Sequence, residues 1–542
     1  MSMNDSATQP DPGNVPLSRL AAWIDRQPRV VLTIYAMTAA FLAYMSMYAF
    51  RKPWSADKYE AQAEVTLFGV AFGYKVVAAI AQLAGYMGSK FLGIKFASEA
   101  SMRQRVPIVI GLILFAECML LGFALVPAPY NILFLVLNGL PLGMVWSMLF
   151  GIVEGRKITE FLALGMSVSV IFSSAWVKDV GRWTMSELGT EVFWMPFVTG
   201  AIFIPVLALS MFMLWHVPPP TAEDIEARTD REPMTRTERR AFIRKYFIGV
   251  LALVMGYTML MGYRNVRDDF MPDILADLGH KLYSDEQVAA LSALDEVDVA
   301  SESLVALGYT AEQSAFLADP ISVLRNGGSE IAYASSHDGI FENLAGVADA
   351  ESLVAVGYSE EQAAFLEDPQ SGMDTLEYKT VSFGSMENWV GVAVIALLCL
   401  LWFFKNNRHA VYANLAFITV GSLLVGATTL MVSNKIIDPK MFYILNGIGL
   451  YMAFVPYQSI FMDRILASLH TVATASFLIA LGDAYGYLTV LSTYLGKDIY
   501  PAFTGGTLDW AQLLSIGAYI VLVGVPICVA VMIGYFNKHL KN

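Results

Sequence analysis

The chain of 542 residues contains 56 % hydrophobic and only 15 % charged residues, with a mean hydropathy of +0.53. Soluble globular proteins usually contain about 25 % charged residues, so this composition excludes an ordinary soluble protein, and the high apolar content excludes a disordered chain. The net charge of −13 is unevenly distributed: the segment 273–385 holds 21 acidic and 3 basic residues, whereas the remainder has a net charge of +5.

Apolar runs long enough to cross a membrane recur along the chain. A helix needs roughly 20 residues to span a hydrocarbon core of about 30 Å. The runs lack the alternating polarity of barrel strands, so the sequence predicts an all-α membrane protein with twelve transmembrane helices. They are predicted at 30–52, 64–87, 107–126, 131–153, 160–181, 193–215, 246–267, 387–404, 410–432, 441–461, 470–494 and 511–535.

Lys and Arg in the short loops predict the orientation. If the N-terminus is cytoplasmic, the inner loops hold most basic residues, including the cluster at 236–245, while the outer loops 126–130 and 182–192 hold few. We therefore expect a multi-pass protein with both termini in the cytoplasm. The acidic segment 273–385 then lies outside, between the seventh and eighth helices.

An internal repeat relates the first and seventh helices. Tyr44 and Arg51 are seven residues apart, and Tyr257 and Arg264 have the same spacing. Each arginine directly follows an aromatic residue near the end of its helix. The two helices therefore occupy equivalent places in two related halves.

A longer repeat relates the fourth and tenth helices. Segments 137–156 and 445–464 share seven of twenty residues without a gap. Their offset of 308 exceeds the offset of 213 between the two arginines by 95 residues, which approximates the size of the acidic segment. The acidic segment is therefore an insert in the second half. In chain order we predict a cytoplasmic segment 1–27, a six-helix half 28–215, a cytoplasmic loop 216–245, helix 7 at 246–272, a helical insert 273–385, helices 8–12 at 386–536 and a cytoplasmic tail 537–542.

Two parallel six-helix repeats joined by a long cytoplasmic loop describe the major facilitator architecture. Transporters of this architecture bind substrate near the midplane between the halves and alternate access by rocking them. A different fold with twelve helices is the alternative.

The residues around the two arginines form two motifs. The stretch Tyr48–Trp54 reads YAFRKPW, which is similar to the aromatic-x-x-Arg-Lys signature on helix 1 of the organophosphate:phosphate antiporters of the major facilitator superfamily. Arg264 is followed by Asp269, Phe270 and Pro272, a spacing similar to the Arg, Asp, Trp and Pro pattern of their helix 7.

Two further motifs extend this resemblance to helices 2 and 4. Lys75, in the stretch AFGYK, resembles their helix 2 lysine, and Gly143–Trp146 reads GMVW, which resembles their Gly-Met-Gly-Trp. The YAFRKP motif is also similar to that of a group of uncharacterised bacterial membrane proteins. The resemblance implies a transporter of the bacterial cytoplasmic membrane that exchanges an organic phosphate for inorganic phosphate.

The residue types themselves favour an anion site. A charge inside a membrane span costs at least about 2.5–3.5 kcal/mol and is seldom without function. Arginine offers a planar fork of donors that matches phosphate, and lysine offers a compact charge. We therefore expect a small anionic solute to bind between the halves. The candidate substrate-binding residues are Arg51, Arg264, Lys75, Tyr44, Tyr48, Tyr257, Tyr263 and Trp146.

The alternative is that Arg51, Lys52, Arg264 and Arg267 extend to the outer membrane interface rather than into a site. The acidic pair that follows Arg267 would neutralise it. In the same way, Lys178, Asp179 and Arg182 crowd the outer end of helix 5 and are predicted to form a cluster at the interface.

Two carboxyl groups lie near helix centres, Glu117 in helix 3 and Asp483 in helix 11. Either could titrate in a proton-coupled cycle, or pair structurally with a lysine or arginine. No catalytic residues, metal ligands, cofactor or nucleic-acid partner are expected, because the sequence has no triad, metal set or phosphate-binding glycine loop.

The insert has a repeat of its own, in which Tyr-Ser/Thr-x-Glu-Gln begins at Tyr283, Tyr309 and Tyr358. Ser or Thr followed three residues later by Gln is a capping box that starts a helix. The longer copies, 302–320 and 351–369, each predict two short helices around a Gly-Tyr turn. We expect a small helical module that binds an extracytoplasmic protein or covers the outer vestibule.

The leading hypothesis is a secondary transporter of a phosphate-bearing or other small anionic solute. The alternatives are a major facilitator carrier of a neutral or proton-coupled solute, and a non-transporting membrane receptor on the same scaffold. An enzyme is not expected.

Overall fold

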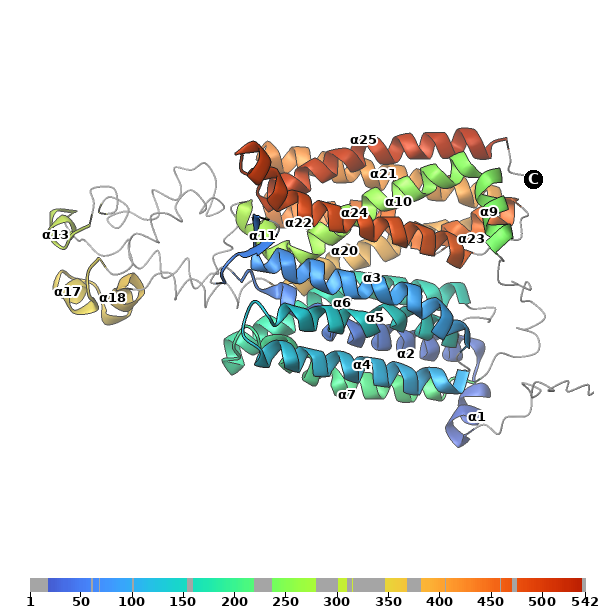
Figure 1. Cartoon of the computed structure of the whole chain (residues 1–542), viewed down its shortest axis with the longest axis horizontal. Helices are drawn as coiled ribbons and strands as arrows, with labels where there is room; N and C mark the ends of the chain where they lie inside the picture. The colour runs from blue at the N-terminus through green and yellow to red at the C-terminus, as the bar shows by residue number, and fades with distance from the viewer. Residues whose placement is uncertain are drawn as a thin grey trace, which may run out of the picture.

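The computed structural model describes residues 18–59, 62–67, 69–99, 102–153, 159–218, 236–278, 301–309, 314, 347–367, 382–404, 406–458, 460–469 and 475–538. Long helices run side by side along the bundle in these residues (Figure 1). The N-terminal half comprises α2 (Arg29–Ala49), α3 (Tyr74–Glu99), α4 (Met102–Leu125), α5 (Ile132–Val153), α6 (Thr159–Leu188) and α7 (Met195–Trp215). The C-terminal half comprises α10 (Phe247–Asp269), α20 (Phe383–Cys399), α21 (Asn407–Ser433), α22 (Pro439–Gln458), α24 (Ala475–Thr504) and α25 (Trp510–Phe536).

The two halves form separate groups of helices that meet along one boundary (Figure 1). Within each half, equivalent helices pack closely: α4 lies against α5, and α21 lies against α22. Across the boundary α6 contacts α20 and α22, and α3 contacts α24. The predicted fold class is therefore confirmed, and each of the twelve predicted spans overlaps one of these long helices.

Apolar side chains are exposed along the outside of the bundle, as on Leu209 and Phe212 of α7 and Val523 and Ile527 of α25. Among the described residues, six helices are long and apolar enough to cross a membrane by length and composition. Such an extensive apolar surface is not stable in water. The chain is thus a multi-pass membrane protein.

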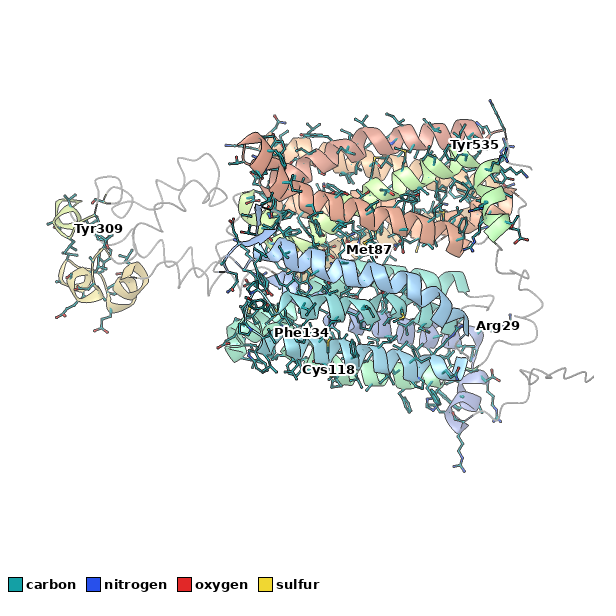
Figure 2. The ribbon with its side chains drawn as sticks, viewed as in Figure 1. Arg29, Met87, Cys118, Phe134, Tyr309 and Tyr535 are labelled. Carbon is teal, nitrogen blue, oxygen red and sulfur yellow. The ribbon has the colours of Figure 1, made fainter. Side chains whose placement is uncertain are left out.

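Shorter elements lie at the two ends of the bundle. The end of the bundle beside the C-terminus, called the terminal end here, carries α1 (Arg19–Asp25), α9 (Arg236–Lys245) and α23 (Ile460–Leu469). The opposite end, where α10 leads into α11 (Met271–Asp277), is called the insert end. Arg29 and Tyr535 mark the terminal end in Figure 2, and Tyr309 marks the insert. The other short elements are η2 (Pro53–Ala56), η4 (Leu400–Phe403) and an antiparallel hairpin, β1 (Val65–Leu67) with β2 (Val70–Phe72), which departs from an all-α chain.

The insert contains α13 (Ser301–Ala306), α17 (Ala350–Ala355) and α18 (Glu360–Glu367). Its two longer repeats end their first helices alike, because Gly308 and Gly357 both have positive φ, at 106° and 121°. The predicted capping box is present in the last copy, where Ser359 and Gln362 exchange hydrogen bonds. Burial raises the pKa of Tyr358 in this module to about 12. The first copy, beginning at Tyr283, lies outside the described residues.

Helices α3 and α5 approach so closely that backbone meets backbone. A Cβ added at Gly85 would overlap the carbonyl of Val136, and one added at Gly139 would overlap the carbonyl of Gln82. Small residues permit this contact between membrane helices. Gly88, one turn beyond Gly85, has no atom within 4 Å of an added Cβ.

Gly85→Ala should therefore destabilise the protein, whereas Gly88→Ala on the same helix should not. Overpacking costs about 1–3 kcal/mol, and alanine is the better helix former by about 1 kcal/mol. We expect the apparent Tm of the detergent-solubilised protein to fall by several degrees in Gly85→Ala and to stay or rise slightly in Gly88→Ala. Equal Tm values for the two variants would contradict the close α3–α5 contact.

Candidate functional site

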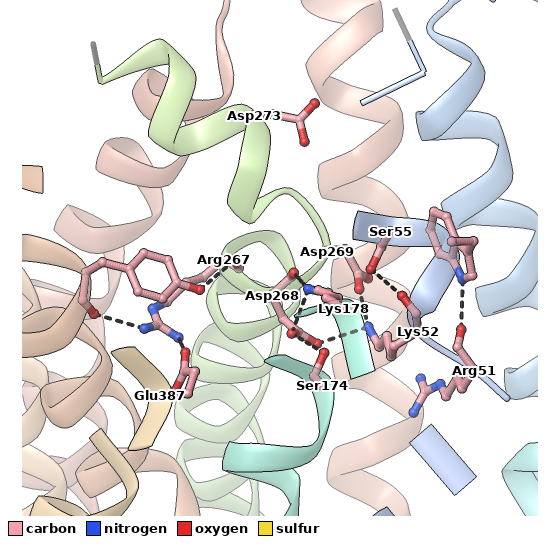
Figure 3. Close-up of polar contacts among 12 residues, drawn as sticks. Arg51, Lys52, Ser55, Ser174, Lys178, Arg267, Asp268, Asp269, Asp273 and Glu387 are labelled. Carbon is pink, nitrogen blue, oxygen red and sulfur yellow. Dashed lines mark hydrogen bonds and ion pairs between the residues drawn. The ribbon is translucent and has the colours of Figure 1, made fainter. Parts of the chain in front are cut away.

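Buried charges connect the two halves at the insert end (Figure 3). Lys52, which follows α2, forms ion pairs with Asp268, at 3.0 Å, and with Asp269. Lys178 of α6 lies 3.2 Å from a carboxylate oxygen of Asp268 and also donates to its backbone carbonyl. Ser174 donates to the same carboxylate at 2.6 Å. Two cations of the N-terminal half thus face two carboxylates of the C-terminal half.

The local sequence places Lys52 for this contact. Helix α2 ends at Ala49, and Pro53 opens the short η2 helix because its fixed φ suits a first helical position. Trp54 then donates to the carbonyl of Arg51 at 2.8 Å, and Ser55 donates to the carbonyl of Lys52 at 2.8 Å. Figure 3 shows Lys52 reaching Asp268 and Asp269, whereas the guanidinium of Arg51 lies apart from this network.

Further bonds join the halves around this network. Lys75 of α3 pairs with Asp273 of α11 at 2.5 Å, and the amide of Gly73 donates to Asp498 at 3.1 Å. Asp179 of α6 accepts from the hydroxyl of Ser382 and from the amides of Phe383 and Gly384, at 2.7–2.9 Å. All of these bonds lie toward the insert end, so that end is closed by polar contacts between the halves.

Two expectations about these residues are corrected. The predicted span 64–87 puts Lys75 near the middle of a membrane helix. The hairpin β1–β2 instead occupies the apolar stretch before Tyr74, and Lys75 is the second residue of α3, so that placement is wrong. The sequence places Lys178 in an interface cluster, yet its side chain is almost wholly buried and paired with Asp268. Its partner comes from the other half, which the local sequence does not reveal.

Arg51 and Arg264 lie buried in opposite halves, with exposed fractions of only 6 % and 7 %. The guanidinium carbon of Arg51 is 3.9 Å from the ring centre of Tyr86, and that of Arg264 is 5.6 Å from the ring centre of Phe454. Within the described part of the chain, Nε of both arginines and Nη2 of Arg264 have no hydrogen-bond partner. Both side chains are thus enclosed by protein, whereas the alternative to a site expected them to extend out toward the membrane interface.

The neighbouring arginine has a different environment. Arg267, one turn after Arg264, pairs with Glu387 at 2.7 Å and donates to the carbonyl of Tyr443 at 2.9 Å (Figure 3). Lys52, Lys75 and Lys178 also face carboxylates. The expectation that Asp268 and Asp269 neutralise Arg267 is wrong, since they face the lysines of the other half.

The two repeats make equivalent contacts between their first and fourth helices. Asn138 and Asn446 are the second residues of the two matching segments. Asn138 donates to the carbonyl of Phe50 at 2.9 Å, and Asn446 accepts from the hydroxyl of Tyr263 at 2.9 Å. Phe50 and Tyr263 directly precede the two arginines, so each repeat uses its asparagine to hold the residue before its arginine.

The predicted aromatic residues divide into two groups. Tyr44, Tyr48 and Trp146 gather beside Arg51: the Tyr44 ring lies 5.5 Å from Tyr48 and 4.7 Å from Trp146, and the guanidinium of Arg51 lies 6.0 Å from the Tyr48 ring. Phe454, which is equivalent to Trp146 in the repeat, stacks on Tyr257 of the second group with 5.5 Å between the ring centres.

Tyr257 and Tyr263 are held within the C-terminal half. Tyr257 donates to Asp483 at 2.6 Å and accepts from Gln458 at 2.9 Å. Tyr263 donates to Asn446, and its ring lies beside Gly517 of α25. Sequence reasoning missed Tyr86 and Phe454, whose contacts with the arginines are made between helices.

The two membrane carboxyl groups also differ. Asp483 accepts from Tyr257 deep in the C-terminal half. Glu117 is buried in α4 against Gly200 of α7, and its carboxylate oxygens have no hydrogen-bond partner among the described residues. No group of three or more His, Cys, Asp or Glu in the described ranges could hold a metal ion.

Several solved transporter structures are similar to this chain. The nucleoside transporter NupG is 11 % identical and covers 92 % of this chain and 98 % of its own, with a TM-score of 0.49. The peptide transporter POT, in complex with sulfate, is 12 % identical at 97 % and 100 % coverage, with a TM-score of 0.46. A D-xylose-proton symporter is 11 % identical at 94 % and 97 % coverage, with a TM-score of 0.44.

No curated protein sequence matches this chain. One family does match, over residues 53–311 and 372–539, which together make up more than half of the chain. The match omits the middle of the insert and begins two residues after Arg51. The chain therefore belongs to this family, a family of unknown function (DUF5690).

Proposed function

We propose that this protein is a secondary active transporter that moves a small anionic solute by alternating access between its two halves. The substrate class is a phosphate-bearing anion, exchanged for inorganic phosphate. The observation that carries the proposal is the pair of buried arginines, Arg51 and Arg264, which occupy equivalent places in the two halves and have guanidinium nitrogens without hydrogen-bond partners among the described residues.

The surrounding charges support an anion rather than a cation. Lys52 and Lys178 are balanced by Asp268 and Asp269, and Arg267 is balanced by Glu387. This pairing leaves the charges of Arg51 and Arg264 for a ligand. A buried charge without a partner is costly in a membrane, and a doubly charged phosphate group would neutralise both guanidinium groups through charge-assisted hydrogen bonds.

The ion pairs at the insert end fit one state of an alternating-access cycle. Lys52, Lys178 and Lys75 of one half hold Asp268, Asp269 and Asp273 of the other. We propose that this end opens when those pairs separate, and that the anion then reaches the arginines from the insert side. Lys75 would act by closing this end rather than by contacting the substrate.

Asp483 is the better placed of the two candidate coupling groups. Its partner Tyr257 is the repeat equivalent of Tyr44, which lies beside Arg51. Glu117 instead lies between α4 and α7 within the N-terminal half. We therefore propose Asp483 as the group that would exchange a proton if transport is proton-coupled.

Replacing either central arginine should remove anion binding without unfolding the protein. A ligand at 100 times its Kd stabilises the folded state by about 2.7 kcal/mol. We expect phosphate or one of a panel of organic phosphates to raise the apparent Tm of the wild-type protein by a few degrees. Arg51→Gln and Arg264→Gln should each abolish this shift, whereas Lys497→Gln, which removes a partly exposed cation paired with Asp498, should retain it. A shift that persists in Arg264→Gln would contradict the proposed site.

Arg264 and Arg267, one turn apart, should respond in opposite ways in the absence of ligand. Breaking a buried ion pair by removing one partner costs about 3–5 kcal/mol, so Arg267→Gln should lower the basal Tm by leaving Glu387 alone. Arg264→Gln removes a charge without a carboxylate partner and should leave the basal Tm unchanged or raise it. Loss of basal stability in Arg264→Gln equal to that in Arg267→Gln would show that Arg264 is structural.

A covalent bond across the insert end should stop transport. In a variant with Cys118, Cys399 and Cys528 replaced by alanine, Asp179→Cys and Ser382→Cys place two thiols where the side chains now meet at 2.9 Å. We expect oxidation to join α6 to the start of α20 and to abolish exchange of radiolabelled phosphate in proteoliposomes.

Reduction should restore the exchange, and each single cysteine variant should be insensitive to oxidation. Undiminished exchange with complete cross-linking would contradict the opening of this end during transport.

A further inference from the structure

A groove with a volume of about 470 Å³ lies between α4 and α7, on the outside of the N-terminal half. Its walls include Pro107 and Ile110 of α4 and Ala208, Phe212 and Trp215 of α7. The lining side chains are mainly aliphatic and aromatic, so the groove suits an apolar ligand rather than a polar one. Phe212 and Trp215 are both 53 % exposed and stand at its edge.

The position of the groove determines what can enter it. Helices α4 and α7 are among those long and apolar enough to span a membrane, and the groove occupies the first turns of α4 and the last turns of α7. It therefore lies in the leaflet at the terminal end of the bundle, where the surrounding molecules are lipids. An apolar groove at this depth fits an acyl chain.

Positive charge gathers beside the mouth of the groove. Helix α4 begins with the sequence Met102-Arg103-Gln104-Arg105, directly before the groove residue Val106. His216 follows α7, and its ring packs on Phe212 with 4.4 Å between the ring centres. The mouth thus combines an aromatic edge with two arginine positions at the depth of lipid headgroups.

The same end of the bundle carries further cations. Figure 1 shows α1 at the end where α4 begins and α7 ends. Arg19 begins this short helix, Arg26 follows it, Arg29 begins α2, and Trp23 of α1 is 59 % exposed. Trp is enriched at membrane interfaces, and basic pockets between membrane helices bind anionic headgroups.

We propose that this groove binds one anionic phospholipid. One acyl chain would lie between α4 and α7, and the headgroup phosphate would lie at the start of α4, where the sequence places Arg103 and Arg105. This site is separate from the central arginines, so it stands whether or not the proposed transport function is correct.

The test is native mass spectrometry of the full-length protein released from detergent with equal amounts of phosphatidylglycerol and phosphatidylethanolamine. We expect one phosphatidylglycerol to be retained in preference to the zwitterionic lipid. The double variant Arg103→Gln and Arg105→Gln should lower this preference by about thirtyfold, since each basic residue near the surface attracts anionic lipid. Ala208→Phe should fill the groove and abolish retention of the bound lipid.

Matched controls distinguish lipid binding in the groove from attraction of lipid by the other basic residues at this end. Arg239→Gln with Arg240→Gln removes two cations of α9 at the same end and should leave retention unchanged. Ala208→Leu provides a smaller obstruction if Ala208→Phe does not fold. The proposal would be overturned if the wild-type protein retained the two lipids equally, or if the α9 control lost as much phosphatidylglycerol as the α4 double variant. It would also be overturned if a folded Ala208 variant still retained the lipid in full.

Discussion

A charge buried in a membrane protein must be neutralised by a partner, and this requirement organises the centre of the molecule. Water cannot solvate the lysines and arginines that the chain places between its helices, so each one needs a carboxylate or a ligand. Lys52, Lys178 and Arg267 obtain carboxylates from other helices. Arg51 and Arg264 instead lie against aromatic rings. The contrast separates the cations that pair with carboxylates across helices from the two arginines proposed to bind the solute.

The internal repeat explains why the available cations come as a pair. Each half has an aromatic residue followed by an arginine near the end of its first helix, and an asparagine of its fourth helix bonds to that aromatic residue. The chemistry of the two contacts differs, because Asn138 binds a backbone carbonyl and Asn446 binds a tyrosine hydroxyl. The halves are thus related in geometry while their side chains have diverged.

The sequence predicts the fold well because membrane spans and repeats are local or periodic signals. Hydropathy alone locates the long helices, and the shared spacing of Tyr44–Arg51 and Tyr257–Arg264 identifies the paired arginines. Hydropathy fails at Lys75, since the apolar strands of the β1–β2 hairpin resemble the start of a helix. It also fails to predict which cations are paired. Lys178 and Asp268 are 90 residues apart, and only the packing of α6 against the other half brings them together.

The distribution of charge at the insert end bears on how opening and anion binding are linked. The cations Lys52, Lys75 and Lys178 all belong to the N-terminal half, and the carboxylates Asp268 and Asp269 belong to the C-terminal half. Separating the halves would therefore leave uncompensated positive charge next to Arg51 and negative charge next to Arg264. An anion entering from that side would be drawn toward the N-terminal half first. It would meet Arg264 only as the carboxylates return to the lysines, so closure and engagement of the second arginine would be the same event.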